Sequence, residues 1–167
     1  GSFIASGSYD QTAKIWDKNT LKVQRTFNHS GRVNALTFDP TGNFLVTGGG
    51  DGDIIVWDFN SASEEHRFSG RSGRITTLAI SSDGKFIVSG SERGVIRVWD
   101  LAQKREVLTL NESGPQINSL SFSPIDNNLL LSGTQDGLVT VWDLQQQKAL
   151  REFKASEDRV TGVTVSP

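Results

Sequence analysis

The chain has 167 residues, with 17 lysines and arginines against 19 aspartates and glutamates, and a formal net charge of −2. Binding to nucleic acid needs excess positive charge, so we expect no nucleic-acid partner. The absence of cysteine excludes disulfides and thiolate chemistry, and no apolar run approaches the ~20 residues of a membrane helix. We therefore expect a cytoplasmic protein with no membrane partner, no cofactor and no metal.

Short strands are the elements that the sequence predicts along the chain. Apolar or alternating runs are bounded by Asp-Gly and Thr-Gly turns, and no segment has the 3.6-residue period of a helix. In chain order, the clearest predicted strands are Phe3–Ser8, Phe86–Ser91, Val95–Asp100, Glu106–Leu110, Ile117–Phe122 and Val160–Val165. The pattern indicates an all-β protein.

An internal repeat organises these strands. The four tryptophans are 41, 42 and 43 residues apart, and each is followed by aspartate: Trp16, Trp57, Trp99 and Trp142. Ten residues before each tryptophan stands a hydroxyl residue, followed by glycine: Ser6, Thr47, Ser89 and Ser132. Chance does not place so many features in register four times.

The segment Ser6-Gly7-Ser8-Tyr9-Asp10, with Lys14-Ile15-Trp16-Asp17 after it, resembles the WD-repeat family of β-propellers, as do its three counterparts. The resemblance covers residues 1–167 as four WD repeats. It implies an all-β propeller of four-stranded antiparallel blades, with four blades in this chain. It also implies a non-catalytic protein–protein interaction scaffold whose partners are proteins or peptides.

In that family, a hydrogen-bonded tetrad of Trp, Ser or Thr, Asp and His ties each blade together. One tetrad is complete: His29, Thr47, Asp51 and Trp57. The other three are partial and use Ser6, Asp10, Trp16, Ser89, Trp99, Ser132, Asp136 and Trp142. The third repeat has Arg71 and Arg93 at the His and Asp positions, and we expect both to turn toward solvent or an acid such as Glu92. Because His29 and Asp51 have this structural explanation, we predict no enzyme.

The predicted strand at 160–165 has no blade behind it, and the strands at 3–27 lack an innermost strand. An unpaired strand edge is prone to association, so we expect residues 160–165 to complete the blade begun at 3–27. Closure within one chain gives four blades splayed by about 90°, whereas two chains give eight at about 45°. The polar outer strands, such as Glu64–Arg67, offer no bulky filler for steep splay. This favours a homodimer through the terminal strands, with the four-bladed monomer and pairing with the rest of a longer chain as alternatives.

Residues at equivalent positions of the repeats define a candidate partner-binding face, because loops on rigid scaffolds carry binding. They are Tyr9, Arg32, Asn34, Arg74, Thr76, Glu92, Gln116, Asn118, Gln135, Arg159 and Thr161. The recurring arginines favour an acidic peptide, and the alternative is that they are solvated loop charges.

The Gly1-Ser2 start is typical of a scar left by tag removal. We therefore expect a segment of a larger propeller protein that self-assembles. The alternative is an engineered or isolated half-propeller that assembles but has no ligand of its own.

Overall fold

The computed structural model describes residues 1–70, 73–111 and 113–166, and within these ranges the chain forms strands and turns with no helix. No helix that could cross a membrane is therefore found in the part of the chain that the structure describes. The strands are β1 (Phe3–Gly7), β2 (Thr12–Asp17), β3 (Val23–Asn28), β4 (Val33–Phe38), β5 (Phe44–Gly49), β6 (Asp53–Asp58), β7 (Glu64–Ser69), β8 (Ile75–Ile80), β9 (Phe86–Ser91), β10 (Ile96–Asp100), β11 (Arg105–Asn111), β12 (Ile117–Phe122), β13 (Leu129–Thr134), β14 (Leu138–Asp143) and β15 (Lys148–Lys154).

Consecutive strands pair antiparallel into four separate sheets, which confirms the predicted all-β blades. Three sheets have four strands, in the orders β4-β5-β6-β7, β8-β9-β10-β11 and β12-β13-β14-β15. The first sheet has three, β1-β2-β3, and lacks the innermost strand that the others possess. Within each sheet, every strand pairs with the strand next to it in the sequence, so the pairing is local.

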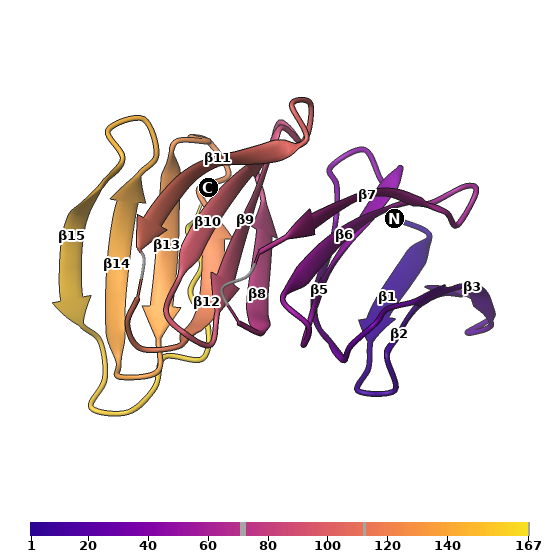
Figure 1. The fold of residues 1–167 in the computed structure, drawn as a ribbon, viewed down its shortest axis with the longest axis horizontal. Coiled ribbons are helices and arrows are strands. Elements are labelled where there is room, and N and C mark those ends of the chain that lie inside the picture. The colour runs from indigo at the N-terminus through magenta and orange to yellow at the C-terminus, as the bar shows by residue number, and fades with distance from the viewer. Residues whose placement is uncertain (71–72, 112, 167) are drawn as a thin grey trace.

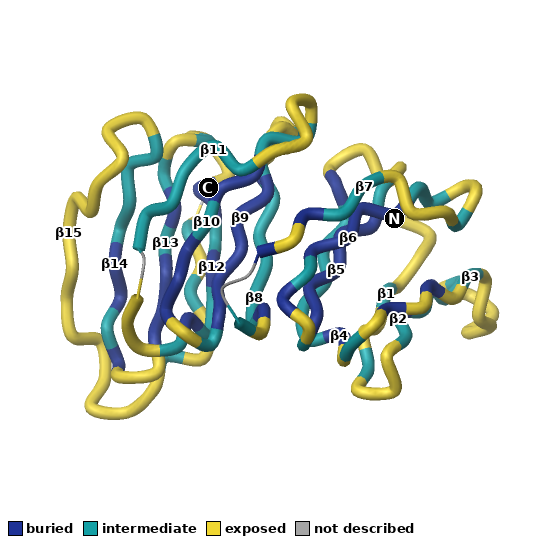
Figure 2. Tube along the Cα trace, viewed as in Figure 1, coloured by how far each residue is buried: buried dark blue, intermediate teal, exposed yellow. Residues whose placement is uncertain are grey.

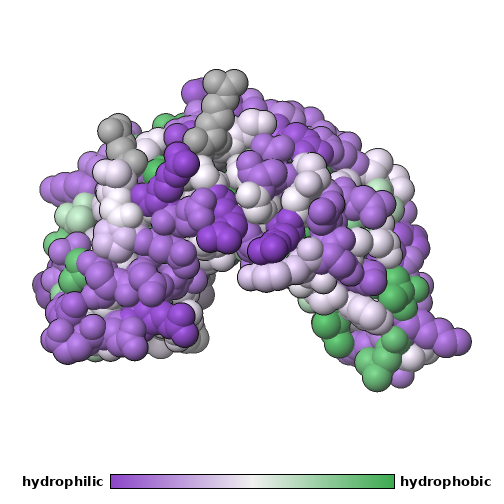
Figure 3. Space-filling view, turned by 60° about the horizontal axis from the view of Figure 1, so that its bottom comes forward, coloured by the Kyte–Doolittle hydropathy of each residue, from purple (hydrophilic) through white to green (hydrophobic). Residues whose placement is uncertain are grey.

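The four sheets stand side by side along an open arc. The innermost strands β4, β8 and β12 lie against one another in turn, and β1 lies against β4. Figure 1 shows the sheets fanning out from this inner row, with the first and fourth sheets at opposite ends. Figure 3 shows the same molecule as an arch with a hollow beneath it.

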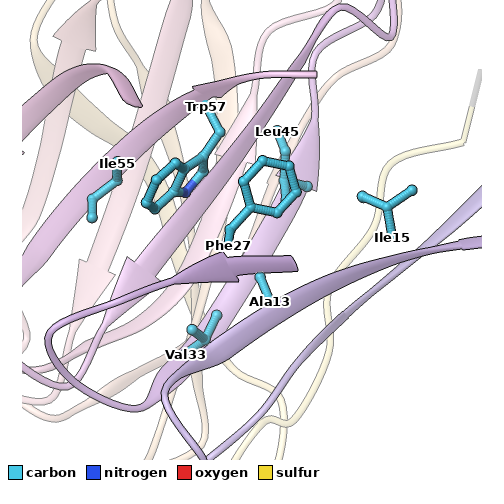
Figure 4. Close-up of a cluster of buried hydrophobic side chains, with 7 residues drawn as sticks. All are labelled: Ala13, Ile15, Phe27, Val33, Leu45, Ile55 and Trp57. Carbon is cyan, nitrogen blue, oxygen red and sulfur yellow. The ribbon is translucent and has the colours of Figure 1, made fainter. Parts of the chain in front are cut away.

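Apolar side chains from adjacent sheets fill the space between them. The junction of the first and second sheets buries Ala13, Ile15, Phe27, Val33, Leu45, Ile55 and Trp57 (Figure 4). Two further clusters join the second sheet to the third and the third to the fourth. Burial is deepest in strands such as β5 and β9, whereas β15 is exposed along its whole length (Figure 2).

Close approach of neighbouring sheets depends on the glycine that follows each hydroxyl residue. A Cβ atom at Gly48 would lie 2.5 Å from Cγ2 of Ile75, the first residue of the next inner strand. A Cβ at Gly90 would lie 2.7 Å from Cγ2 of Ile117. Any side chain here would push the blades apart, because protein cores are close-packed.

The turn between the third and fourth strands of each blade has one geometry, set by the aspartate after tryptophan. Asp58 Oδ1 accepts a hydrogen bond from the Ser61 backbone N–H at 2.7 Å, and Asp100 Oδ1 accepts one from Gln103 at 2.7 Å. Five residues after each tryptophan, a residue other than glycine has a left-handed backbone: Leu21 (φ 54°), Ala62 (φ 56°), Lys104 (φ 52°) and Gln147 (φ 57°). The side chain of the aspartate therefore closes the turn without glycine.

Residues 160–165 do not form the strand expected of them within the single chain. Val160 N–H donates to the Thr134 carbonyl at 2.9 Å, and Val163 N–H donates to the Ser119 hydroxyl at 3.0 Å. This segment is thereby held against the fourth sheet, at the other end of the arc from β1. Among the described residues β1 pairs with β2 alone, so the blade begun at 3–27 is not completed by its own chain.

Candidate functional site

A hydrogen bond from tryptophan to the hydroxyl residue ten positions earlier occurs in every blade. The indole Nε1 of Trp57 donates to Thr47 Oγ1 at 2.8 Å, and both side chains are buried. The same bond joins Trp16 to Ser6 at 2.9 Å, Trp99 to Ser89 at 2.9 Å and Trp142 to Ser132 at 2.8 Å. It fixes the second strand of each blade to the third through their side chains.

The second half of the expected tetrad pairs the buried His29 with Asp51, whose side chain is 23% exposed. His29 Nδ1 lies 3.3 Å from Asp51 Oδ2, close enough for an ion pair, yet neither imidazole nitrogen has a hydrogen-bond partner among the described residues. The Ser30 hydroxyl donates to Asp51 instead. Gly49 makes this packing possible, because a Cβ there would lie 2.3 Å from His29 Cε1. The four tetrad residues thus form two separate pairs.

Burial sets the direction of the pKa shift of His29, and hydrogen bonds set that of Asp51. Burial lowers the pKa of His29, and the nearby Asp51 carboxylate raises it by less, so the net pKa lies below the ordinary 6.5. Burial raises the pKa of Asp51, but hydrogen bonds from Ser30 and the Asp53 backbone outweigh it, so that pKa lies below 3.8. At neutral pH, His29 is therefore an uncharged imidazole beside a carboxylate.

The partial tetrads lack a histidine, and their aspartates bond within their own turns. Asp10 Oδ1 accepts from the Thr12 backbone N–H at 2.9 Å and from its hydroxyl at 2.7 Å. Asp136 Oδ1 accepts from the Thr134 hydroxyl. In the third repeat, Arg71 lies outside the described residues.

Charged and aromatic residues of the candidate face meet in two contacts. The Arg32 guanidinium lies over the Tyr9 ring, 4.7 Å from its centroid. Arg74 Nη2 lies 2.8 Å from Glu92 Oε2, and the Arg74 backbone N–H also donates to Glu92 at 3.1 Å. Glu92 therefore neutralises an arginine from the preceding loop, and this hydrogen-bonded ion pair lowers the pKa of Glu92.

A polar hollow of about 590 Å³ lies between these loops and the inner strands. It is lined by Gly7, Ser8, Tyr9, Val33, Asn34, Arg74, Thr76 and Gln116. A neighbouring hollow of about 410 Å³ adds Arg32, Gly50 and Asp51 to Arg74. Figure 3 shows hydrophilic residues over the hollow of the arch. The structure thus brings candidate residues from all four sheets together around one concave surface.

Three candidate residues also join neighbouring blades, a role that the sequence analysis did not foresee. The Asn34 amide donates to the Ile75 carbonyl at 2.9 Å, and the Asn118 amide donates to the Val160 carbonyl at 3.0 Å. The Thr76 hydroxyl makes the equivalent bond to Ile117. Asn118 also reaches Gln135 Oε1 at 3.3 Å, and Gln116 donates to Asn118 at 2.8 Å. Arg159 and Thr161 lie exposed at the fourth-sheet end.

A further groove of about 340 Å³ lies between the outer parts of the third and fourth sheets. Apolar side chains of Val98, Val107, Leu108 and Leu144 line it, with amides from residues such as Asn127 at its rim. The groove could not be predicted from the sequence, because its walls come from separate blades. Within the described ranges, no three His, Cys, Asp or Glu residues gather as metal ligands would.

Four antiparallel blades, each with a Trp–hydroxyl bond and set side by side on an arc, define a β-propeller type of protein. The model of the family "WD domain, G-beta repeat" matches residues 1–17, 21–58, 62–100 and 104–143. The chain belongs to the WD-repeat family.

Several curated proteins are similar to part of the chain. "WD repeat, SAM and U-box domain-containing protein 1" of Danio rerio is 40% identical over 63 residues, which cover 36% of this chain and 13% of the relative. "Small ribosomal subunit protein RACK1" of Neurospora crassa is 34% identical over 67 residues, 40% of this chain and 21% of the relative. Human "F-box-like/WD repeat-containing protein TBL1Y" is 32% identical over 68 residues, 41% and 13% respectively. The aligned part therefore spans about a fifth or less of each of these relatives.

Proposed function

We propose that this chain is a non-catalytic scaffold that binds protein or peptide partners on the concave loop face. The observation that carries the proposal is the hollow of about 590 Å³ that Tyr9, Arg74 and Gln116 line on a frame of packed sheets. Loops that a rigid scaffold holds in place are suited to recognition. Membership of the WD-repeat family supports the same reading.

The chemistry of the face favours an extended acidic segment. Arg32 is already stacked on Tyr9, and an arginine held this way presents its donors to a carboxylate with little further loss of side-chain freedom. Arg74 can exchange Glu92 for a carboxylate of the partner at small cost, since an exposed ion pair contributes little stability. The occupant that fits is a peptide with carboxylates spaced to meet both arginines.

The pair of His29 and Asp51 supports a non-catalytic role. A general acid or base must reach the substrate, but His29 is 6% exposed and its ring lies against Gly49. Burial also holds the pKa of His29 below its ordinary value. The pair has a packing role that accounts for each of its contacts.

We also propose that a second copy completes the first blade, so that two chains form one eight-bladed ring. The segment 160–165 lies where a fifth blade would place its innermost strand, because the Asn118–Val160 bond repeats the Asn34–Ile75 bond between complete blades. The first sheet lacks that strand. A mass near twice 18.2 kDa by light scattering is expected, and a mass near 18.2 kDa at every concentration would contradict this part.

Binding is tested with an array of acidic and neutral peptides, read by fluorescence anisotropy at two salt concentrations. We expect acidic peptides to bind, and their affinity to fall as salt rises because screening weakens exposed charge pairs. Changing Arg32, Arg74 and Arg159 together to alanine should abolish that binding.

The matched control changes Arg25, Arg105 and Lys148 to alanine, which removes the same charge from the outer strands. Equal weakening by both triple variants would mean that net charge, and not this face, attracts the peptide. Unchanged binding by the face variant would show that the face is assigned wrongly. A ring that forms but binds none of the peptides would favour the isolated half-propeller without a ligand.

A further inference from the structure

The outer strands carry a contact that recurs from blade to blade. Eleven residues after its tryptophan, the first blade has Phe27 and the second has Phe68, which are 2% and 3% exposed. Each ring packs on the tryptophan of the following blade: Phe27 on Trp57 with centroids 5.3 Å apart, and Phe68 on Trp99 at 5.1 Å. An outer aromatic residue of one blade therefore covers the tryptophan of the next.

The third blade has leucine at this position, and this leucine packs into the corresponding junction between sheets. Leu110 and Trp142 both pack against the apolar cluster that joins the third sheet to the fourth. A branched aliphatic side chain is thus sufficient to fill the space. The contact is defined by its position in the repeat and by its apolar character.

The fourth blade carries the corresponding residue with nothing to cover. Phe153, on β15, is 54% exposed. Aromatic side chains bury large areas in cores and interfaces, so this exposure leaves an apolar ring in water. The same strand exposes Leu150. Its counterparts are the polar Gln24 and Glu65 in the first two blades and Val107, which packs at the junction with the fourth sheet, in the third.

The first blade has a tryptophan, Trp16, without an outer side chain such as Phe153 to cover it among the described residues. Ile4 is 50% exposed, whereas its counterparts Leu45, Ile87 and Leu130 are fully buried. Ile4 stands opposite Trp16 on the neighbouring strand, and among the described residues no outer side chain of a preceding blade covers that tryptophan. Phe3 on the same strand as Ile4 is 41% exposed, and Figure 3 shows hydrophobic residues exposed at the foot of the arch that the first sheet forms.

We propose that Phe153 of one copy packs on Trp16 of a second copy and locks the ring at its outer edge. This inference rests on the proposed ring of two chains and adds an apolar contact to it. A second copy is the occupant that fits. The fourth-sheet end of the arc offers the outer aromatic residue, Phe153, and the first-sheet end offers the uncovered tryptophan, Trp16. The partner contact repeats the geometry of Phe27 on Trp57 and of Phe68 on Trp99.

The register of the complete blades places the inner side of the same junction. In the second blade Thr37 pairs with Val46, and in the third Ala79 pairs with Val88. The corresponding residues at the junction are Thr164 of one copy and Ala5 of the other. The Thr161 hydroxyl then reaches the Val33 carbonyl of the second copy, as Asn34 reaches Ile75.

The outer lock is tested by replacing Phe153 with serine and measuring dimer dissociation by sedimentation over a dilution series. Truncation of a buried aromatic residue is expected to raise the dissociation constant about 100-fold or more. Lys154→Ser on the same strand is the control and should leave dissociation unchanged, because the equivalent residues of the other blades are all polar: Asn28, Ser69 and Asn111. Phe153→Leu should restore most of the affinity, because leucine fills this position in the third blade.

Strand pairing is tested separately with two single-cysteine variants, since the chain has no cysteine of its own. Ala5→Cys and Thr164→Cys, when mixed and oxidised, should form a disulfide-linked pair of chains that neither variant forms alone. Cross-linking together with an unaltered dissociation constant for Phe153→Ser would overturn the outer lock and leave the two-chain ring standing. A monomer without cross-links would overturn both.

Discussion

The tryptophan hydrogen bond allows a direct measurement of what burial adds to one repeated interaction. Ser89 and Ser6 accept the same bond from Trp99 and Trp16, and both bonds are 2.9 Å long. Ser89 is 3% exposed, whereas Ser6 lies on the exposed β1. Ser89→Ala and Ser6→Ala therefore remove one hydroxyl from chemically matched positions that differ in access to water.

The expected costs differ because water can replace the hydroxyl at only one of the two positions. At Ser89, truncation leaves the Trp99 N–H buried without a partner, which costs about 1–3 kcal/mol of unfolding free energy. At Ser6, water can accept the hydrogen bond from the Trp16 N–H in place of the hydroxyl, and the loss of unfolding free energy should stay within about 0.5 kcal/mol. For a chain of this size, 2 kcal/mol corresponds to a fall in Tm of about 4–8 °C.

The assay is urea unfolding followed by tryptophan fluorescence, at a concentration low enough to keep the chains apart. Equal losses for Ser89→Ala and Ser6→Ala would refute the reasoning, because burial would then not determine the cost. The same experiment at high concentration reports on the ring. If a second copy covers Trp16, the cost of Ser6→Ala should rise toward that of Ser89→Ala.

Three other perturbations have expected outcomes. Burial holds the pKa of His29 below 6.5, so as pH falls below 6.5 the unfolded chain binds a proton that the folded chain does not. The free energy of unfolding, measured by urea titration, should therefore fall between about pH 7.5 and pH 5.5. If His29→Gln shows the same dependence of unfolding free energy on pH, this reasoning is contradicted. Gly48→Ala places a Cβ 2.5 Å from Ile75 Cγ2 and should cost about 1–3 kcal/mol in the same assay; a stabilised variant would show that the blades can separate. The ammonium of Lys104 lies 2.9 Å from Glu65 and both side chains are 49% exposed, so Lys104→Ala should change Tm by less than about 2 °C, and a larger fall would indicate a role beyond the ion pair.

The strands were predictable because each blade repeats a pattern of apolar alternation bounded by turn residues. The predicted Phe86–Ser91 and Ile117–Phe122 are identical to β9 and β12, and Glu106–Leu110 falls within β11. The prediction for residues 160–165 differs from the single chain for a physical reason. A strand requires a hydrogen-bonding neighbour, and the alternation of residues along a segment does not specify where that neighbour is.

The details of the candidate site were less accessible from sequence. The bond of Trp57 to Thr47 was expected from the resemblance to the WD-repeat family, because the ten-residue spacing places the two residues on paired strands. Ser30 donates to Asp51, and Arg74 pairs with Glu92, because the loop that leads into a blade lies beside the turn after its second strand. The path of such a loop is not encoded in the repeat pattern.

The aspartate-closed turn after each tryptophan leaves one position of every repeat open to variation. A left-handed backbone costs an ordinary residue about 1–2 kcal/mol, while glycine there would cost about 0.5–1 kcal/mol of chain entropy. The two costs are of similar size, so glycine has little advantage over other residues at this position. The hydrogen bonds of the aspartate hold the turn in either case. Leucine, alanine, lysine and glutamine all occupy the position: Leu21, Ala62, Lys104 and Gln147. Leu21, Lys104 and Gln147 are exposed, whereas Ala62 packs against the apolar cluster of the first junction. Three of the repeats therefore carry a display position at which the side chain can be varied, or a short peptide grafted, while the frame beneath stays the same.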